Sequence, residues 1–323
     1  MRALVARRLL QAVVIVALAA TATFLLVKLA PGDPFTDMVD NPRVPAEVRE
    51  RWRARWGLDR PAHEQYLLYL RNLVRGDLGW SFSQHRPVAH AIADALPNTL
   101  LLMSIGLIGA FVVGITAGVV RAGRRGSPAD RALGAGTLVF YSMPEFWLAT
   151  MAMLLFAYWV PIFPTSGIKS PVLYDYLSPI GKVIDRLWHL ALPATTLVLV
   201  IAAIIARYQR AAVLDVATQD FVRTARAKGL PERHVLWRHI LRNALFPVIT
   251  LGGLSLPLLV GGTVFIEKVF AWPGIGRLAV DAIGARDHAL VIAIAVMASV
   301  LVALGSLLAD LLYAVSDPRL RAH

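Results

Sequence analysis

The stretch Ala289–Val315, ALVIAIAVMASVLVALGSLLADLLYAV, decides the fold class of the chain. It contains one charged side chain, Asp310. A run of about 20 or more apolar residues is long enough to cross the hydrocarbon core of a bilayer. Because hydrocarbon offers no water to backbone N–H and C=O groups, a run of this kind must be helical. The stretch therefore predicts a transmembrane helix.

Five further apolar runs precede it: Leu9–Leu29, Thr99–Val120, Ala132–Val160, Leu190–Ala206 and Leu245–Ile266. The third run is interrupted by Ser142-Met143-Pro144-Glu145. The first resembles a signal peptide, but it is long for one and no small-residue cleavage site follows, so we interpret it as a retained helix. Apolar residues make up 57% of the chain, charged residues 17%, and the mean hydropathy is +0.60. We predict an all-α integral membrane protein with six transmembrane helices.

The distribution of charge predicts the orientation. Six spans place both termini on one side, and the segments on that side contain 17 basic and five acidic residues, whereas the opposite segments contain 15 and 14. The whole net charge excess of +12 therefore lies on one face, which the positive-inside rule makes cytoplasmic. This pattern indicates topology and anionic lipid rather than nucleic acid. The absence of cysteine excludes disulfides and thiolate metal sites.

The spans and loops divide the chain into four parts: a first transmembrane helix (1–30), an external segment (31–94), a transmembrane domain (95–316) with a cytoplasmic loop at 209–242, and a cytoplasmic tail (317–323). The external segment is expected to contain short helices. One opens at Pro45-Ala46-Glu47, and Gln65–Val74 is amphipathic.

The cytoplasmic loop between spans four and five has the pattern of two helices separated by glycine. Thr218-Gln219-Asp220 offers an N-cap for a short helix, Phe221–Lys228, and Gly229 supplies a stop. Pro231 then opens a second helix, Glu232–Arg242. A structured, basic and partly apolar element at this place indicates a docking surface for a cytoplasmic partner or for lipid headgroups.

The run FVRTARAKGLP, Phe221–Pro231, resembles the coupling-loop (EAA-type) motif of ABC importer permeases, in the form of the dipeptide/oligopeptide/nickel family. Arg223-Thr224-Ala225 stands where the general motif has Glu-Ala-Ala. The resemblance extends over nearly the whole chain, through LAPGDPF (29–35), LDRP (58–61), GDLG (76–79), WPGIGRL (272–278) and DLLYAVSDPR (310–319). The long external segment after span one is similar to that of B-type permeases.

The resemblance implies a transport subunit rather than an enzyme. Its partners would be a second, C-type permease, two cytoplasmic ABC ATPase subunits and an external solute-binding protein, in the cytoplasmic (inner) membrane of a bacterium. The chain itself would hold no cofactor, since ATP and Mg would be bound by the ATPases, and no G-x-x-x-x-G-K-[ST] motif occurs in it. The implied cargo is a dipeptide or an oligopeptide, with nickel or another small solute as the alternative.

Three groups of candidate site residues follow. The resemblance implies that one group of residues couples the chain to the ATPase: Phe221, Arg223, Thr224, Ala225, Lys228, Gly229 and Pro231. The break in span three makes Ser142, Pro144 and Glu145 candidates for the translocation pathway, although Glu145 could instead face a wet cavity or pair with another subunit. An external gate or binding-protein contact is assigned to Trp272, Pro273, Gly274 and Gly276, for which a plain structural turn is the alternative.

Gly114-Ile115-Thr116-Ala117-Gly118 is a G-x-x-x-G pattern on span two, which allows close helix packing. Packing inside this chain is favoured over packing against the partner permease. The sequence disfavours two other classes of protein. An intramembrane enzyme would need a G-x-S-x-G-like serine, an H-E-x-x-H or paired intramembrane aspartates, which the sequence lacks. A stand-alone secondary carrier would show internal repeats and paired ionisable residues at the midplane, and neither is evident.

Overall fold

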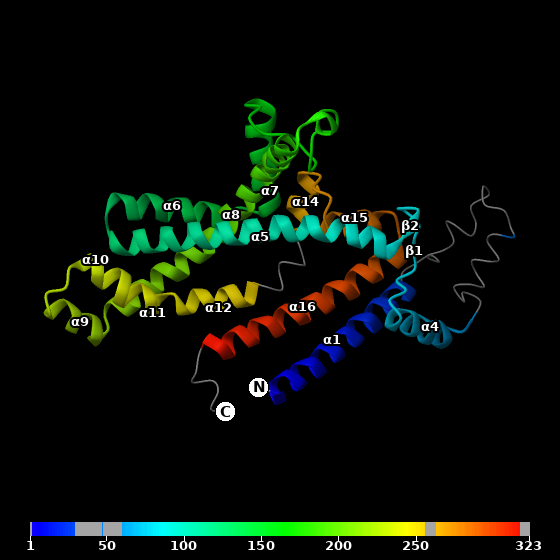
Figure 1. The fold of residues 1–323 in the computed structure, drawn as a ribbon, viewed down its shortest axis with the longest axis horizontal. Coiled ribbons are helices and arrows are strands. Elements are labelled where there is room, and N and C mark those ends of the chain that lie inside the picture. Colours follow the sequence, from blue (N-terminus) through cyan, green and yellow to red (C-terminus); the bar gives the residue numbers. More distant parts are fainter. Residues whose placement is uncertain (1, 30–46, 48–59, 256–262, 317–323) are drawn as a thin grey trace. The chain divides into compact units, whose positions relative to one another are not determined.

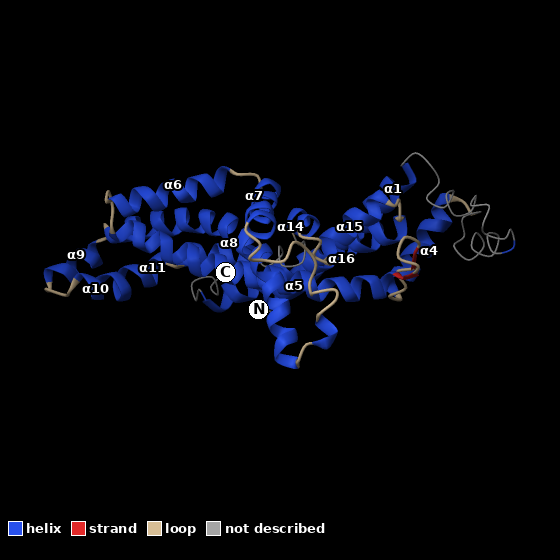
Figure 2. Cartoon of the chain, turned by 90° about the horizontal axis from the view of Figure 1, so that it is seen from above, coloured by secondary structure: helices blue, strands red, loops and turns tan. Residues whose placement is uncertain are grey.

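The computed structural model describes residues 2–29, 47, 60–255 and 263–316 (Figure 1). Helices dominate the described chain, and strands are limited to one short hairpin there (Figure 2). The chain divides into two compact units: Met1–Pro97 with Leu278–Leu307, and Asn98–Arg277 with Leu308–His323.

The first unit contains two long apolar helices and a small polar region. Its elements are α1 (Arg2–Leu29), α4 (Ala62–Val74), β1 (Trp80–Ser81), β2 (Arg86–Pro87), the first residues of α5 (Val88–Gly123), most of α15 (Ile275–Gly284) and most of α16 (His288–Ser316). Helix α4 is attached to α1 through aromatic contacts, because Phe24 packs against Tyr66 and Tyr69, and the hydroxyls of Tyr66 and Thr21 are 2.6 Å apart.

The β1–β2 hairpin is fastened to the start of α16 by Asp287. The Asp287 carboxylate accepts hydrogen bonds from the Ser81 hydroxyl (2.6 Å) and the Ser83 amide (2.9 Å), and also from the Leu290 amide of α16 (3.1 Å). Asp287 is therefore both the N-terminal cap of α16 and the anchor of the hairpin. The strands pair antiparallel, with Trp80 opposite Pro87, and this hairpin was not expected from the sequence.

The second unit is built around α5 and α8. Its elements are the rest of α5, α6 (Pro128–Ser142), α7 (Glu145–Met153), the π-helix η1 (Leu154–Trp159), the 3-10 helix η2 (Tyr174–Tyr176), α8 (Pro179–Ala217), α9 (Asp220–Ala227), α10 (Glu232–His234), the π-helix η3 (Val235–Leu241), α11 (Arg242–Ala244), α12 (Phe246–Ser255), α14 (Val264–Val269) and the start of α15.

Glycines on one face of α5 allow close contact with α8. A Cβ on Gly114 would meet Ile205 Cβ at 2.6 Å and the Ala202 carbonyl at 3.0 Å, and a Cβ on Gly118 would meet the Ala206 carbonyl at 2.8 Å. The predicted G-x-x-x-G pattern therefore packs inside the chain, as the sequence favoured.

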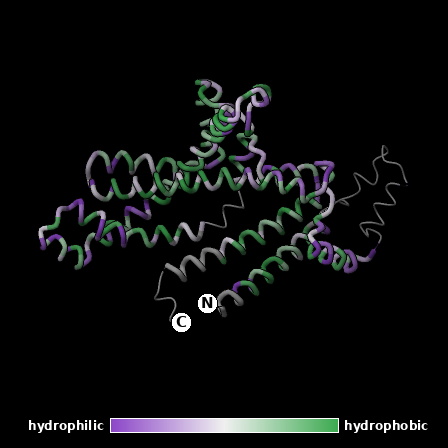
Figure 3. Tube along the Cα trace, viewed as in Figure 1, coloured by the Kyte–Doolittle hydropathy of each residue, from purple (hydrophilic) through white to green (hydrophobic). Residues whose placement is uncertain are grey.

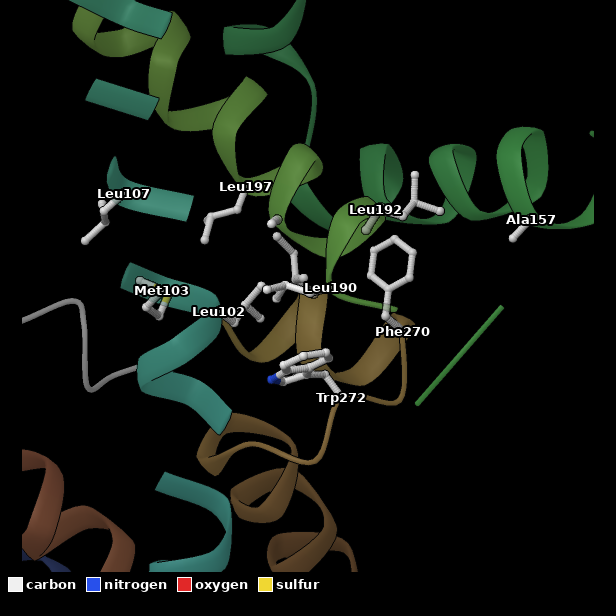
Figure 4. Packing of buried hydrophobic residues seen from close by; sticks show 12 residues of the cluster. Leu102, Met103, Leu107, Ala157, Leu190, Leu192, Leu197, Phe270 and Trp272 are labelled. Carbon is white, nitrogen blue, oxygen red and sulfur yellow. The ribbon is translucent and has the colours of Figure 1, made fainter. Parts of the chain in front are cut away.

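One apolar cluster joins α5, α8 and the segment after α14 (Figure 4). Leu102 of α5, Leu190 and Leu197 of α8, and Phe270 and Trp272 are each at most 3% exposed. Because lipid is as apolar as these side chains, the cluster is held together by close van der Waals packing within the chain. The cluster fixes the loop that follows α14 to the two long helices of this unit.

Within the residues that the structure describes, four single helices are long and apolar enough to cross a membrane: Arg8–Leu26 within α1, α5, α8 and His288–Leu307 within α16. The predicted break in span three is present, but α6 and the α7–η1 segment diverge by 106°, a larger change of direction than one straight crossing allows. The fifth predicted span, Leu245–Ile266, includes 256–262, which lie outside the described residues. The predicted count of six is therefore not established.

Two helices extend well past the predicted spans. Helix α8 has 39 residues and begins at Pro179, where Ser178 caps it by accepting a hydrogen bond from the Gly181 amide (3.2 Å). Helix α5 begins at Val88. A search for apolar runs finds only the part of a helix that matches hydrocarbon, so it misses amphipathic extensions. The predicted amphipathic helix at Gln65–Val74 corresponds to α4. Of the helix expected to open at Pro45-Ala46-Glu47, only Glu47, which is helical, lies within the described residues.

Candidate functional site

The loop between α8 and α12 contains a short helix, α9 (Asp220–Ala227), where the sequence predicts one over Phe221–Lys228. Val222 and Ala225 form its inner face and are 0% and 5% exposed. They belong to an apolar cluster with Val213 of α8 and Val235 of η3. Helix α9 is therefore attached to α8 by buried side chains rather than held only by its two ends.

The start of α9 differs from the prediction. The Thr218 hydroxyl donates to the Asp215 carbonyl (2.7 Å) at the end of α8, and Gln219, at the N-cap position, forms no side-chain cap bond. Thr218 thus completes the end of α8. Thr224 likewise bonds within α9, to the Asp220 carbonyl (3.0 Å).

Gly229 ends α9 as the sequence predicts. Its φ is +75°, in the left-handed region that favours glycine. The Gly229 amide donates to the Arg226 carbonyl (2.9 Å) and the Leu230 amide to the Ala225 carbonyl (3.4 Å), which is the double bond pattern of a Schellman cap. A Cβ at Gly229 would meet nothing within 4 Å, so backbone conformation rather than space requires glycine.

An ion pair crosses the Gly229 turn. Arg226 Nε and Nη2 lie 3.1 and 2.7 Å from the two carboxylate oxygens of Glu232. This two-point contact lowers the pKa of Glu232 and raises the pKa of Arg226. Because both side chains are largely exposed, the pair orders the turn and adds little to global stability.

The segment after Pro231 is helical from Glu232 to Ala244, but its middle is the π-helix η3 (Val235–Leu241) instead of the regular helix predicted for Glu232–Arg242. Val235, Ile240 and Leu241 of this segment are buried. The wider turn leaves Trp237 59% exposed. An exposed tryptophan beside α9 is a strong candidate contact residue that the sequence analysis did not include.

The predicted coupling residues separate into two groups. Phe221 is 41% exposed, and Arg223, Thr224, Lys228, Gly229 and Pro231 are also exposed, whereas Ala225 is buried. Polar and apolar residues alternate along the segment (Figure 3). Its exposed side chains combine an aromatic ring with cations. Such a surface is suited to bind in a groove of another protein. We call Phe221, Arg223, Lys228 and Trp237 the α9 surface.

A buried ion cluster ties the neighbouring ends of α5, α6 and α8. Asp130 accepts hydrogen bonds from Arg121 Nε (3.2 Å), Arg210 Nη2 (3.0 Å) and the Gly126 amide (3.1 Å). Ser127 caps α6 through the Asp130 amide. Two of the basic residues that predicted the topology are thus also structural, and they stiffen the helices from which α9 extends.

The candidate pathway residues lie at the sharp bend. Helix α6 ends at Ser142, and Pro144 is the N-cap of α7, where Glu145 begins the helix. Ser142 and Pro144 are exposed, and Glu145 is half-buried. Glu145 lies beside the Thr263 hydroxyl, and neither Glu145 Oε1 nor that hydroxyl forms a hydrogen bond of regular geometry within the described chain. The bend therefore holds two neighbouring buried polar groups.

The loop Trp272–Arg277 is organised by Glu267, a residue that the sequence analysis did not single out. Glu267 is fully buried in α14, and its carboxylate accepts bonds from the Thr99 hydroxyl (2.7 Å) and the Arg277 amide (2.9 Å). The Thr99 hydroxyl in turn accepts from the Ile275 amide (2.7 Å). Glu267 thus links the loop to α5.

The predicted gate residues are fixed parts of this arrangement. Trp272 is fully buried, and its Nε1 donates to the Asn98 carbonyl (2.9 Å), while Asn98 Nδ2 donates to the Pro273 carbonyl (2.9 Å). A Cβ on Gly274 would overlap the Glu267 carboxylate, and one on Gly276 would lie 2.9 Å from Val264 Cα. The glycines are therefore required by close packing, which supports the structural-turn alternative for this loop.

These features define a multi-pass helical membrane protein with a fixed, basic and partly apolar surface segment between α8 and α12. The chain belongs to the family of binding-protein-dependent transport system inner membrane components, whose profile matches residues 95–322, while the N-terminal profile of the same group matches residues 1–103.

Curated relatives agree with this membership over nearly their whole length. The chain is 40% identical over 321 residues to the oligopeptide transport system permease protein AppB of Bacillus subtilis, covering 99% of each protein. It is 38% identical over 312 residues to the di/tripeptide transport system permease protein DppB of Pseudomonas aeruginosa, covering 93% of each.

Proposed function

We propose that the chain is a permease subunit of an ATP-driven importer that moves dipeptides or oligopeptides across the cytoplasmic membrane of a bacterium. The observation that supports it most is the α9 surface, which is attached to α8 through buried residues and presents Phe221 outward. The names of the relatives, an oligopeptide and a di/tripeptide permease, support the peptide cargo.

In this proposal α9 is the coupling helix and rests in a groove of a cytoplasmic ATPase subunit. ATP and Mg are bound by two such ATPases, a second permease completes the pore, and an external binding protein delivers the cargo. Both termini lie in the cytoplasm, and six spans cross the membrane. The chain supplies the pathway and the coupling surface and performs no chemical step itself.

The packing of α9 explains how motion of the ATPase would be transmitted. Val222 and Ala225 share one apolar cluster with Val119 of α5 and Val213 of α8, and Asp130 joins the ends of α5, α6 and α8. Because close-packed contacts deform little, a displacement of α9 moves these helices with it. The bend at Pro144, with Glu145, is then a place where the pathway can change shape.

Co-purification tests the assembly. The C-terminally tagged chain is extracted from native membranes in mild detergent, and bound proteins are identified by mass spectrometry. We expect a second permease, ATPase subunits and a solute-binding protein whose bound ligand is a peptide. A binding protein that carries nickel would overturn the peptide cargo, and recovery of the chain alone in several detergents would overturn the importer assignment.

Phe221→Ala tests the coupling role in proteoliposomes that contain the assembled complex. The ring is 41% exposed, so its removal should leave the inner face of α9 intact and reduce ATP-driven uptake about tenfold, in line with the loss of a central aromatic contact. Phe156→Ala, at a ring that is 43% exposed in η1, is the matched control and should keep uptake. Equal uptake in both variants would refute the coupling role.

A further inference from the structure

Three cationic side chains surround one aromatic ring in the segment that leads into α8. Lys169 Nζ lies 4.5 Å, Arg186 Cζ 5.3 Å and Lys182 Nζ 5.5 Å from the centroid of the Tyr174 ring. Within the described ranges, none of the three cations forms an ion pair. We call Lys169, Tyr174, Lys182 and Arg186 the Tyr174 cluster.

Local structure holds the cluster together. Helix α8 begins at Pro179, after the cap residue Ser178, and therefore contains both Lys182 and Arg186. These two residues are at positions i and i+4, one turn apart on the same side of the helix. The Asp185 carboxylate accepts a hydrogen bond from the Ser170 amide (2.9 Å), which fastens the turn containing Lys169 and Tyr174 to the helix. The acidic groups beside the cluster are Asp185, which is also 3.6 Å from His189, and the exposed Asp175.

Like charges at helix positions i and i+4 destabilise a helix, and a third cation increases the repulsion. The Tyr174 ring offsets part of this, because its face attracts cations. A bound anion would offset far more. The Tyr174 cluster therefore has the electrostatic character of a site for a singly charged, multidentate anion such as a phosphodiester.

An apolar stripe lies next to the cluster on the same part of α8. Ile180, Val183, Ile184 and Leu187 are between 55% and 73% exposed, and they recur at the i, i+3, i+4 and i+7 spacing of one helix face. Trp188, 47% exposed, extends the stripe and packs on Phe163. An apolar stripe flanked by cations and aromatic rings is typical of a helix segment at the membrane–water interface.

The length of α8 agrees with this position. A helix of 39 residues spans about 58 Å, nearly twice the ~30 Å of bilayer hydrocarbon, so part of it must lie outside that layer. Residues 179–189 precede the uninterrupted apolar part and lie at one end. They would be at the level of the lipid headgroups.

We infer that the Tyr174 cluster is a binding site for the headgroup of an anionic phospholipid, with the phosphodiester held by Lys169, Lys182 and Arg186 and the acyl chains covering the apolar stripe. The site requires only that the chain spans a membrane, so it goes beyond the proposed importer function and does not depend on it. Its occupant is a lipid rather than a soluble anion, because the cluster and the stripe are contiguous along α8.

The test uses the purified complex, delipidated in mild detergent and titrated with dioleoyl phosphatidylglycerol or dioleoyl phosphatidylcholine, with bound lipid counted by native mass spectrometry. Each basic residue near an anionic surface contributes on the order of fivefold in affinity, so Lys182→Gln/Arg186→Gln should weaken phosphatidylglycerol binding about thirtyfold. Phosphatidylcholine binding should be weaker and unaffected. The charge-conserving Lys182→Arg/Arg186→Lys variant should keep phosphatidylglycerol binding.

The matched control is Arg71→Gln/Arg75→Gln, which removes two exposed cations one turn apart in and beside α4. It should bind phosphatidylglycerol as the wild type does.

Equal loss in both double variants, equal binding of the two lipids, or loss of binding in the charge-conserving variant would each overturn the inference. Displacement of the lipid by millimolar inorganic phosphate would identify a soluble-anion site instead. Loss of the second permease from Lys182→Gln/Arg186→Gln would identify a subunit interface and also overturn it.

Discussion

Glu267 shows how much of the loop after α14 depends on one side chain. Its carboxylate is buried and accepts from one hydroxyl and two backbone amides, those of Thr99, Gly276 and Arg277. Buried donors that lose their acceptor cost about 1–3 kcal/mol each. The glycines of this loop can be recognised in the sequence but the acid they surround cannot, because nothing in a local pattern shows which carboxylate a distant threonine will reach.

Glu267→Gln should therefore destabilise the protein. The amide nitrogen would face backbone donors, so the free energy of unfolding should fall by about 1–3 kcal/mol, and the apparent melting temperature in detergent by about 2–6 °C. Thermal unfolding followed by tryptophan fluorescence measures this. Glu64→Gln, at an exposed residue 3.8 Å from Arg60, is the control and should change stability by no more than about 0.5 kcal/mol. An unchanged melting temperature for Glu267→Gln would contradict the hydrogen bonding of the Glu267 carboxylate.

At the scale of helices, the contact between α5 and α8 depends on glycine. Gly118→Val should destabilise the protein by about 3 kcal/mol, because its Cβ would meet the Ala206 carbonyl at 2.8 Å and the backbone cannot easily move aside. Gly136→Ala, in α6, is the control, since its Cβ would meet nothing within 4 Å and alanine favours a helix by about 0.5–1 kcal/mol. A lower melting temperature for Gly118→Val and a higher one for Gly136→Ala would support the close contact between α5 and α8. Similar melting temperatures of the two variants would argue against that contact.

The Gly229 turn should respond to pH through Glu232. The pKa of this carboxyl is lowered by Arg226, so the pair stabilises the turn above the ordinary pKa of about 4.5 and is lost as the pH falls through the lower, folded value. Hydrogen exchange at the Leu230 amide, corrected for intrinsic rates, should be constant from pH 8 to 6 and increase up to about fivefold toward pH 3. Glu232→Gln should already exchange faster at pH 7 and show no such increase. An identical profile in both proteins would disprove the role of the pair.

The elements that sequence reasoning located best are those with a strong local signal. The Gly229 stop, the break at Pro144 and the long apolar helices all follow from backbone chemistry or composition. Prediction was weaker where neighbours decide the outcome. The π-helix η3 and the extensions of α5 and α8 depend on packing against other helices, and the Asp287-anchored hairpin depends on a hydrogen bond between residues 206 positions apart.

For the whole molecule, the basic residues predict the orientation in the membrane, with the loop between α5 and α6 in the cytoplasm. The chain contains no cysteine, so single cysteines can be introduced without a background. In intact cells a membrane-impermeant maleimide should label Arg75→Cys, after α4, and should label Arg124→Cys, between α5 and α6, only after the membrane is opened. Both positions are exposed. The opposite pattern would reverse the topology predicted from the basic residues.

The sequence alone predicts a helical membrane protein, an excess of basic residues in the segments on one side of the membrane, and a segment, Phe221–Pro231, that resembles a coupling motif. These properties are local, since they depend on runs of apolar residues, on charge counts and on short motifs. Only the tertiary structure shows which side of α9 faces outward and which carboxylates are buried and accept several hydrogen bonds. It also shows that Lys169 lies at the Tyr174 ring together with Lys182 and Arg186. Such features arise when helices pack, because burial and hydrogen bonding depend on residues distant in sequence, which no local pattern encodes.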